Sequence, residues 1–160
     1  MMSSATETIA TATSQFRSFR NVELCKVGTW GASTGQVTIT RADLAAAVAA
    51  SRRLPYPTIK IGHTDPRFDG EPALGRVANL RLADKGATLV GDLVDIPAWL
   101  AAAIPTAFSQ RSIEAVKNFT NNAITYRFVI TGLALLGADW PAVTDLPSLQ
   151  KQLAQEGANA

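Results

Sequence analysis

The chain contains one histidine, His63, and it lies where a short apolar segment runs into Gly-His-Thr-Asp-Pro. Its imidazole is the only side chain here whose ordinary pKa suits acid–base chemistry near neutral pH. A histidine of this kind can take the proton of a serine hydroxyl and make it a nucleophile. Two serines, Ser109 and Ser112, follow in a polar segment between apolar runs. The residues alone therefore indicate a serine–histidine centre, or else an exposed loop histidine, and leave the choice of serine open.

A carboxylate lies two residues beyond the second serine, in the string Arg-Ser-Ile-Glu at 111–114. In a β-strand, alternate side chains share a face, so Ser112 and Glu114 should lie on one face and Ile113 on the other. Glu114 could then orient or tune a histidine; the alternative is an exposed strand glutamate. The Gly-x-Ser-x-Gly elbow of α/β-hydrolases is absent from the sequence, which disfavours that class.

Composition excludes several classes of function. The net charge is +2 and the fifteen Lys and Arg residues are scattered, so no basic stripe predicts a nucleic-acid partner. No apolar run reaches the ~20 residues of a membrane span. With one histidine and one cysteine, we expect no metal and no cofactor. Cys25 lies in an apolar segment and should be buried. The acidic residues Asp65, Asp69 and Glu71 are expected to form a solvated loop.

Hydrophobic periodicity predicts the elements that must position these residues. Thr40 and Asp43 resemble a helix capping box, and Asp95 looks like the cap of a helix that begins at Ile96 and ends at Pro105. We expect strands at 16–27, 37–39, 58–61, 74–82, 88–94, 111–116 and 124–136, helices at 44–53, 96–104 and 145–155, and turns at 28–31, 33–35, 84–86 and 121–122.

This pattern predicts a mainly β or α+β fold: a small antiparallel β-barrel with two or three flanking helices. The segment 124–136 is the best candidate for a central strand. The expected organisation is a disordered arm at 1–15, one folded domain at 16–144, and a C-terminal helix and tail at 145–160.

An ordered series of short motifs resembles a known family. The series comprises a Gly-Thr-Trp turn at 28–30, Thr-Arg-Ala-Asp-Leu at 40–44, Ile-Gly-His at 61–63, Pro-Ala-Leu-Gly-Arg-Val at 72–77, Leu-Val-Gly-Asp-Leu at 89–93, Ile-Pro-Ala-Trp-Leu at 96–100, Arg-Ser-Ile-Glu-Ala at 111–115 and the apolar stretch 130–137. Together, over residues 16–143, these motifs are similar to the capsid maturation (prohead) proteases of tailed bacteriophages, the group that includes Mu-type protease/scaffold proteins.

The resemblance implies a fold like that of the herpesvirus assemblin protease and a serine endopeptidase that cleaves scaffold and capsid precursors, and in some cases itself. It implies that His63 is the general base and that Ser112 rather than Ser109 is the nucleophile. Backbone N–H groups, for which the loop at 137–139 is a candidate, would hold the oxyanion. The implied partners are the major capsid protein and the scaffold protein, with self-association allowed. The implied location is the assembling prohead in the host cytoplasm.

The sequence departs from the family at the third catalytic member. The matching stretch offers Thr131 and Gly132, with neither acid nor imidazole. The role could pass to Glu114, to an acid from another loop, or to a polar group or water. The gap supports an alternative reading as a weak or inactive protease-fold protein that scaffolds head assembly. A small-molecule hydrolase or binding barrel is the third hypothesis.

Overall fold

The computed structural model describes residues 15–32, 35–62, 72–137, 143 and 146–149. Within these residues the chain is mainly β, with two α-helices, which confirms the α+β expectation. The elements in chain order are β1 (Phe16–Lys26), β2 (Gly28–Ala32), β3 (Gly35–Ile39), α2 (Arg41–Ser51), β4 (Thr58–Ile61), β5 (Arg76–Ala83), the 3-10 turn η1 (Asp84–Gly86), β6 (Thr88–Pro97), α3 (Ala98–Ala107), β7 (Gln110–Asn121) and β8 (Ile124–Leu136).

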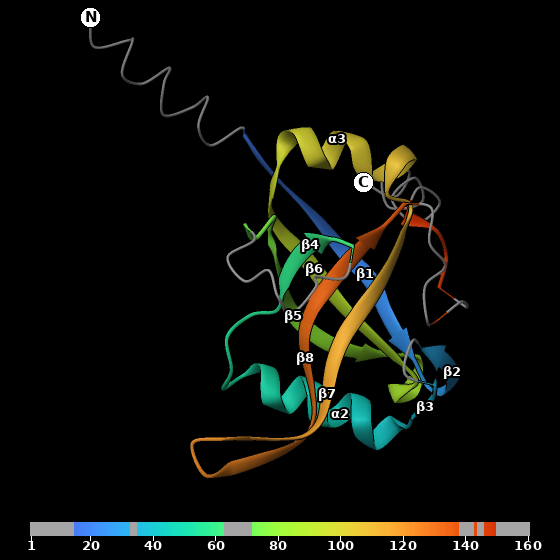
Figure 1. The fold of residues 1–160 in the computed structure, drawn as a ribbon, viewed down its shortest axis with the longest axis vertical. Helices are drawn as coiled ribbons and strands as arrows, with labels where there is room; N and C mark the ends of the chain where they lie inside the picture. Colours follow the sequence, from blue (N-terminus) through green and yellow to red (C-terminus); the bar gives the residue numbers. More distant parts are fainter. Residues whose placement is uncertain (1–14, 33–34, 63–71, 138–142, 144–145, 150–160) are drawn as a thin grey trace, which may run out of the picture.

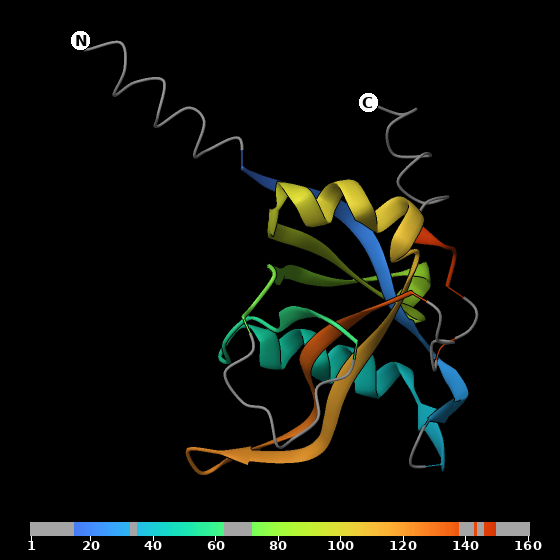
Figure 2. The same ribbon diagram turned by 45° about the horizontal axis from the view of Figure 1, so that its top comes forward.

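Six of the strands form one curled sheet in the order β1-β6-β5-β4-β8-β7. Figure 1 shows β4, β8 and β7 in front of β5, β6 and β1, with α3 at one end and α2 at the other. Figure 2 confirms that the two helices lie at opposite ends of the sheet. The segment 124–136 is indeed an interior strand, because β8 lies between β4 and β7.

The expected small antiparallel β-barrel is not found: the described strands form no closed barrel. β1 and β7 are the two ends of the strand order, and β4 pairs with β8 in parallel. The two end strands are bridged by a side chain, since Arg111 Nε on β7 donates a 2.9 Å hydrogen bond to the backbone carbonyl of Glu23 on β1. The fully buried Arg111 side chain thus connects β7 to β1, two strands that backbone hydrogen bonds would connect in a closed barrel.

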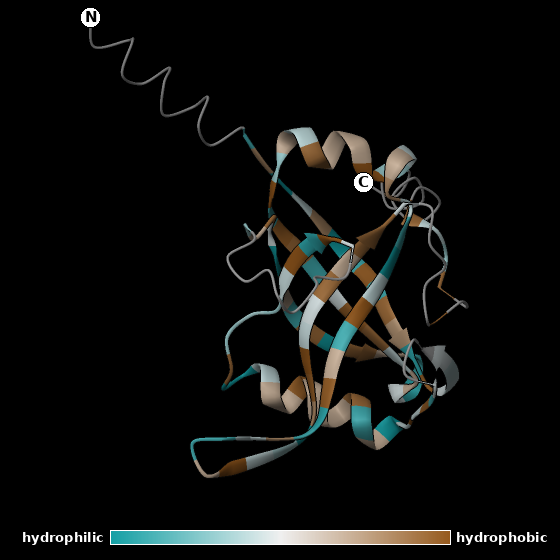
Figure 3. Ribbon diagram, in the orientation of Figure 1, coloured by the Kyte–Doolittle hydropathy of each residue, from teal (hydrophilic) through white to brown (hydrophobic). Residues whose placement is uncertain are grey.

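The hydrophobic core lies between the front and back strands and is capped by the helices. Ile59 on β4 and Leu133 and Leu135 on β8 are fully buried in it, together with Leu44 of α2 and Leu100 of α3. In Figure 3 hydrophobic residues follow the helices and the strands of the body, whereas the projecting end of the β7–β8 hairpin is mostly hydrophilic or neutral. Neither described helix has the length and apolar character needed to cross a membrane.

The capping box predicted for helix α2 is confirmed, although the helix (Arg41–Ser51) begins and ends earlier than the expected 44–53. The Thr40 hydroxyl accepts from the Asp43 N–H, and the Asp43 carboxylate accepts from the Thr40 N–H, which completes a capping box. Such a cap contributes about 0.5–2 kcal/mol.

Several local predictions are wrong. Strand β7 (Gln110–Asn121) is longer than the strand expected at 111–116. The expected turn at 28–31 is strand β2, because Thr29 and Trp30 find cross-strand partners in Thr38 and Val37 of β3. Cross-strand pairing of this kind stabilises a ribbon that short-range turn signals do not reveal.

The start and end of helix α3 also differ from the prediction. Its N-cap is Pro97, while Asp95 belongs to β6 and pairs with Arg76. Pro105 lies inside the last turn of α3 rather than ending it. A proline there removes a single helical hydrogen bond, which a helix packed on the sheet tolerates. The predicted arm at 1–15 and helix at 145–155 fall almost wholly outside the described residues.

Candidate functional site

Ser112 lies on β7 opposite Ala134 of β8, and it is 6% exposed. Residues paired across strands project from the same face, so Ser112 and Glu114 share the face that carries Ala134 and Gly132. Ile113 points the other way and packs against the core. The alternation predicted for 112–114 is therefore confirmed.

Glu114 makes an ion pair that spans β8. Its Oε1 atom lies 2.6 Å from Nζ of Lys60 on β4, and both side chains are about a quarter exposed or less. Glu114 is opposite Gly132, and Lys60 is opposite Ala134, so the two charged side chains approach each other over small residues of the strand between them. Partial burial strengthens the electrostatic attraction within this ion pair relative to a pair in open solvent.

Lys60 was missed by the sequence analysis. The string Thr-Ile-Lys-Ile at 58–61 does carry a signal, because alternation places Lys60 on the face opposite the buried Ile59. Nothing local, however, indicates that β4 inserts beside β8 or in which register.

Arg111 holds the strand that carries Ser112. Its side chain is fully buried and donates from Nε and Nη2 to the Glu23 carbonyl, and from Nη1 to the Pro147 carbonyl. Burial lowers the pKa of the guanidinium to about 10, while the Glu23 charge acts in the opposite direction, so Arg111 stays cationic at neutral pH. The beginning of β7 is thereby fixed to β1 and to residue 147. Sequence reasoning used Arg111 only as part of a motif.

His63 lies outside the described residues, but the residue before it does not. The Gly62 N–H donates a 2.9 Å hydrogen bond to the carbonyl of Leu135, the residue opposite Arg111. Gly62 has φ +69, in the left-handed region that glycine adopts without strain. The chain therefore leaves β4 level with the beginning of β7, and a glycine allows it to turn there.

The remaining predicted residues take other roles or fall outside the description. Ser109 precedes β7, and its backbone carbonyl accepts a 2.7 Å hydrogen bond from the Leu149 N–H. The acidic residues at 65, 69 and 71 lie outside the described part of the chain. Within that part, no group of three or more His, Cys, Asp or Glu side chains is arranged to hold a metal ion. Cys25 is fully buried, as predicted.

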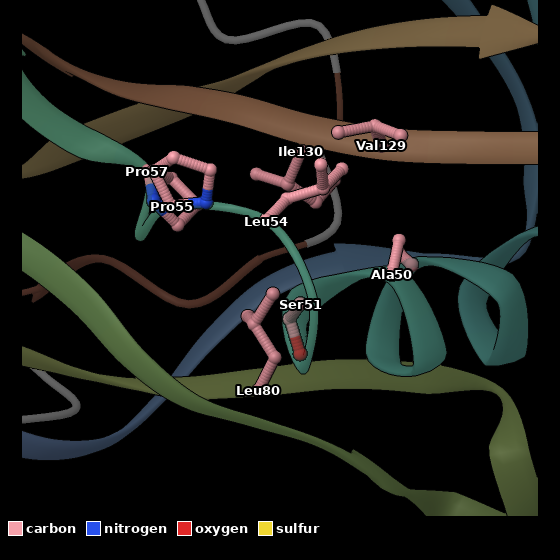
Figure 4. A pocket seen from close by; sticks show the side chains of 9 residues that line it. Ala50, Ser51, Leu54, Pro55, Pro57, Leu80, Val129 and Ile130 are labelled. Carbon is pink, nitrogen blue, oxygen red and sulfur yellow. The ribbon is translucent and has the colours of Figure 1, made fainter. Parts of the chain in front are cut away.

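A small cavity lies beside the C-terminal end of α2, between that helix and strands β5 and β8 (Figure 4). It has room for about one water molecule, and its lining is mostly apolar: Ala47, Ala50, Ser51, Leu54, Pro55, Pro57, Leu80, Val129 and Ile130. Typical small-molecule sites measure about 300–1,000 Å³. Neither Ser112 nor Glu114 lines it, so this cavity is separate from the candidate site.

The candidate site is therefore a serine and a carboxylate on one face of β7, with a lysine from β4 that forms an ion pair with the carboxylate. Comparison with known proteins adds no relative to this picture: no family model, no curated protein and no solved structure matches the chain.

Proposed function

We propose that this protein is a serine endopeptidase of phage capsid maturation, with Ser112 as nucleophile and His63 as general base. The observation that carries the proposal is the strand order β4-β8-β7. It places Ile61, the last residue of β4, level with Arg111, the residue before Ser112, because both pair with Leu135 of β8. Adjacent strands are about 4.8 Å apart, so β4 and β7 lie about 10 Å apart across β8. His63 follows Ile61 by two residues in the sequence.

The reaction follows from these groups. His63 takes the proton of Ser112 as Oγ attacks the peptide carbonyl of a scaffold or capsid precursor. The tetrahedral oxyanion is held by backbone N–H donors, each worth about 3–4 kcal/mol when well aligned. His63 then gives the proton to the leaving amine, and water releases the acyl group from Ser112. Glu114, on the same face as Ser112, is the third member that orients the imidazole.

Covalent labelling tests this assignment directly. A serine-directed fluorophosphonate should modify the wild-type protein at Ser112, as located by mass spectrometry of the digested product. Ser112→Ala and His63→Ala should abolish the labelling, whereas Ser109→Ala should retain it and serves as the matched control. A folded wild-type protein that is labelled at another serine, or at none, would refute the endopeptidase.

A second candidate is a protease-fold assembly protein without activity, and the Lys60–Glu114 pair is the observation in its favour. A carboxylate that is already neutralised by an ammonium 2.6 Å away stabilises an imidazolium less than a carboxylate without that cation would. Under this alternative, the Ser112→Ala protein would support normal processing and assembly of the head precursors. The third hypothesis, a small-molecule hydrolase, gains no support from the small cavity beside α2.

A further inference from the structure

The Glu114 carboxylate lies directly over Gly132. A Cβ atom built on Gly132 would approach Glu114 Oε1 to 2.7 Å, whereas its next neighbour outside Glu114, the Thr58 carbonyl oxygen, would be 3.5 Å away. The first distance is too short for any real side chain, and the second is ordinary van der Waals contact. Absence of a side chain at 132 is therefore what allows the carboxylate to cross strand β8.

Lys60, on the neighbouring strand β4, holds the carboxylate in that position. Its Nζ atom lies 2.6 Å from Oε1, and Lys60 is opposite Ala134, the residue that is also opposite Ser112. Ala134 is fully buried and carries only a methyl group. The ammonium, the carboxylate and the serine hydroxyl thus stand on one face, around two small residues of the same strand.

We propose that Lys60 and Gly132 are positioning residues, which together fix the Glu114 carboxylate on the Ser112 face of the sheet. The role rests on the endopeptidase proposed above, in which Glu114 orients the base. Gly132 also belongs, with Thr131, to the stretch in which the sequence offers neither an acid nor an imidazole as third member. Its glycine admits the carboxylate of the neighbouring strand into that stretch.

The geometry makes Gly132→Ala a selective perturbation. The atom that must move is the end of a flexible side chain, and Gly132 is not among the glycines with positive φ, so alanine fits the backbone. Gly132→Ala should therefore displace the carboxylate and leave the free energy of unfolding almost unchanged. Gly31→Ala is the matched control, because nothing lies within 4 Å of a Cβ atom there.

The experiment measures the rate of Ser112 labelling by the fluorophosphonate. Misplacing an orienting group by about 1 Å can cost roughly 100-fold in rate, so we expect Gly132→Ala and Lys60→Met to label about 100-fold more slowly. Lys60→Arg, which keeps the charge, should be labelled at a rate within about threefold of wild type. Gly31→Ala should be labelled at the wild-type rate. Glu114→Gln should be as slow as Gly132→Ala, and the double variant no slower, because both act through one carboxylate.

The outcomes separate this proposal from the function on which it rests. Wild-type protein that is not labelled at Ser112 would overturn the endopeptidase and the positioning role with it. Wild type that is labelled, with folded Gly132→Ala and Lys60→Met labelled equally fast, would overturn the positioning role alone. Additive losses in the Gly132→Ala/Glu114→Gln double variant would also overturn it. If Gly132→Ala does not fold, the Lys60→Met and Lys60→Arg pair decides the matter.

Discussion

Arg127 Nε on β8 donates a 2.9 Å hydrogen bond to Oδ1 of Asp43, the residue that also closes the capping box of helix α2. One buried carboxylate, 3% exposed, thus ties the helix beginning to the stem of the β7–β8 hairpin. Burial by itself raises the pKa of Asp43, but the hydrogen bonds from Arg127 and Thr40 and the charge of Lys117 outweigh it. The net pKa lies below the ordinary value.

This depressed pKa predicts acid sensitivity. A carboxyl whose pKa is lower in the folded state contributes stability above its unfolded pKa of about 3.9, and loses it as pH falls through the folded value. Asp92 behaves alike: burial raises its pKa, and hydrogen bonds from Asn21, Asn79 and Arg81 lower it further than burial raises it. Urea unfolding from pH 7 to pH 2 should show stability falling below about pH 4.

The Asp43→Asn variant isolates one of these groups. It should lose about 1–2 kcal/mol at pH 7, through weakened charge-assisted hydrogen bonds, and its stability should depend less on pH in the acid range. An unchanged acid slope in Asp43→Asn would show that this carboxylate does not carry the effect.

Truncation of the Arg111 side chain should cause a large loss of stability. Arg111→Ala leaves the carbonyl oxygens of Glu23 and Pro147 without their donor and opens a cavity, at a cost of about 3 kcal/mol or more in the free energy of unfolding. Arg20 is exposed on the same strand as Glu23, and Arg20→Ala should change stability by about 0.5 kcal/mol at most. Equal midpoints for the two variants in chemical denaturation would contradict the bridging role of Arg111.

Replacing Gly75 should destabilise the protein through its backbone, whereas replacing Gly132 should only displace a side chain. The φ of Gly75 is +118, and a Cβ atom there would lie 2.8 Å from the Val94 carbonyl oxygen. That oxygen belongs to the backbone, so it cannot move away as the end of a side chain can. Gly75→Ala should therefore lower stability by about 1–3 kcal/mol, measured by thermal unfolding with Gly31→Ala as the control. Retention of the wild-type midpoint would show that the β4–β5 connection relaxes freely.

The Cys25 thiol should not react with alkylating reagents in the folded protein. Burial, as the largest effect, raises the pKa of its thiol to about 12, so almost no thiolate exists at pH 8. Iodoacetamide should leave the native protein unmodified for hours and alkylate it within minutes in urea. Rapid alkylation of the native state would mean that β1 opens locally.

The local parts of this design could be predicted from the sequence because they depend on neighbours in the chain. Strand β8 has the predicted bounds, since β-branched and apolar residues continue from Ile124 to Leu136. The Thr40–Asp43 cap needs residues three apart, and the shared face of Ser112 and Glu114 needs only strand periodicity. The role of His63 as base stays a prediction.

Which strands pair, and in which register, depends on the packing of the whole fold. Strand alternation alone puts Ser112 and Glu114 on one face, and it puts Lys60 on the face opposite the buried Ile59. The insertion of β4 in parallel beside β8 then placed Lys60 across from Glu114, and Gly132 left the space between them. Such long-range pairing is selected by the burial of the whole core, here by Ile59, Leu133 and Leu135 on the opposite face, and so has no signature in any short stretch of residues.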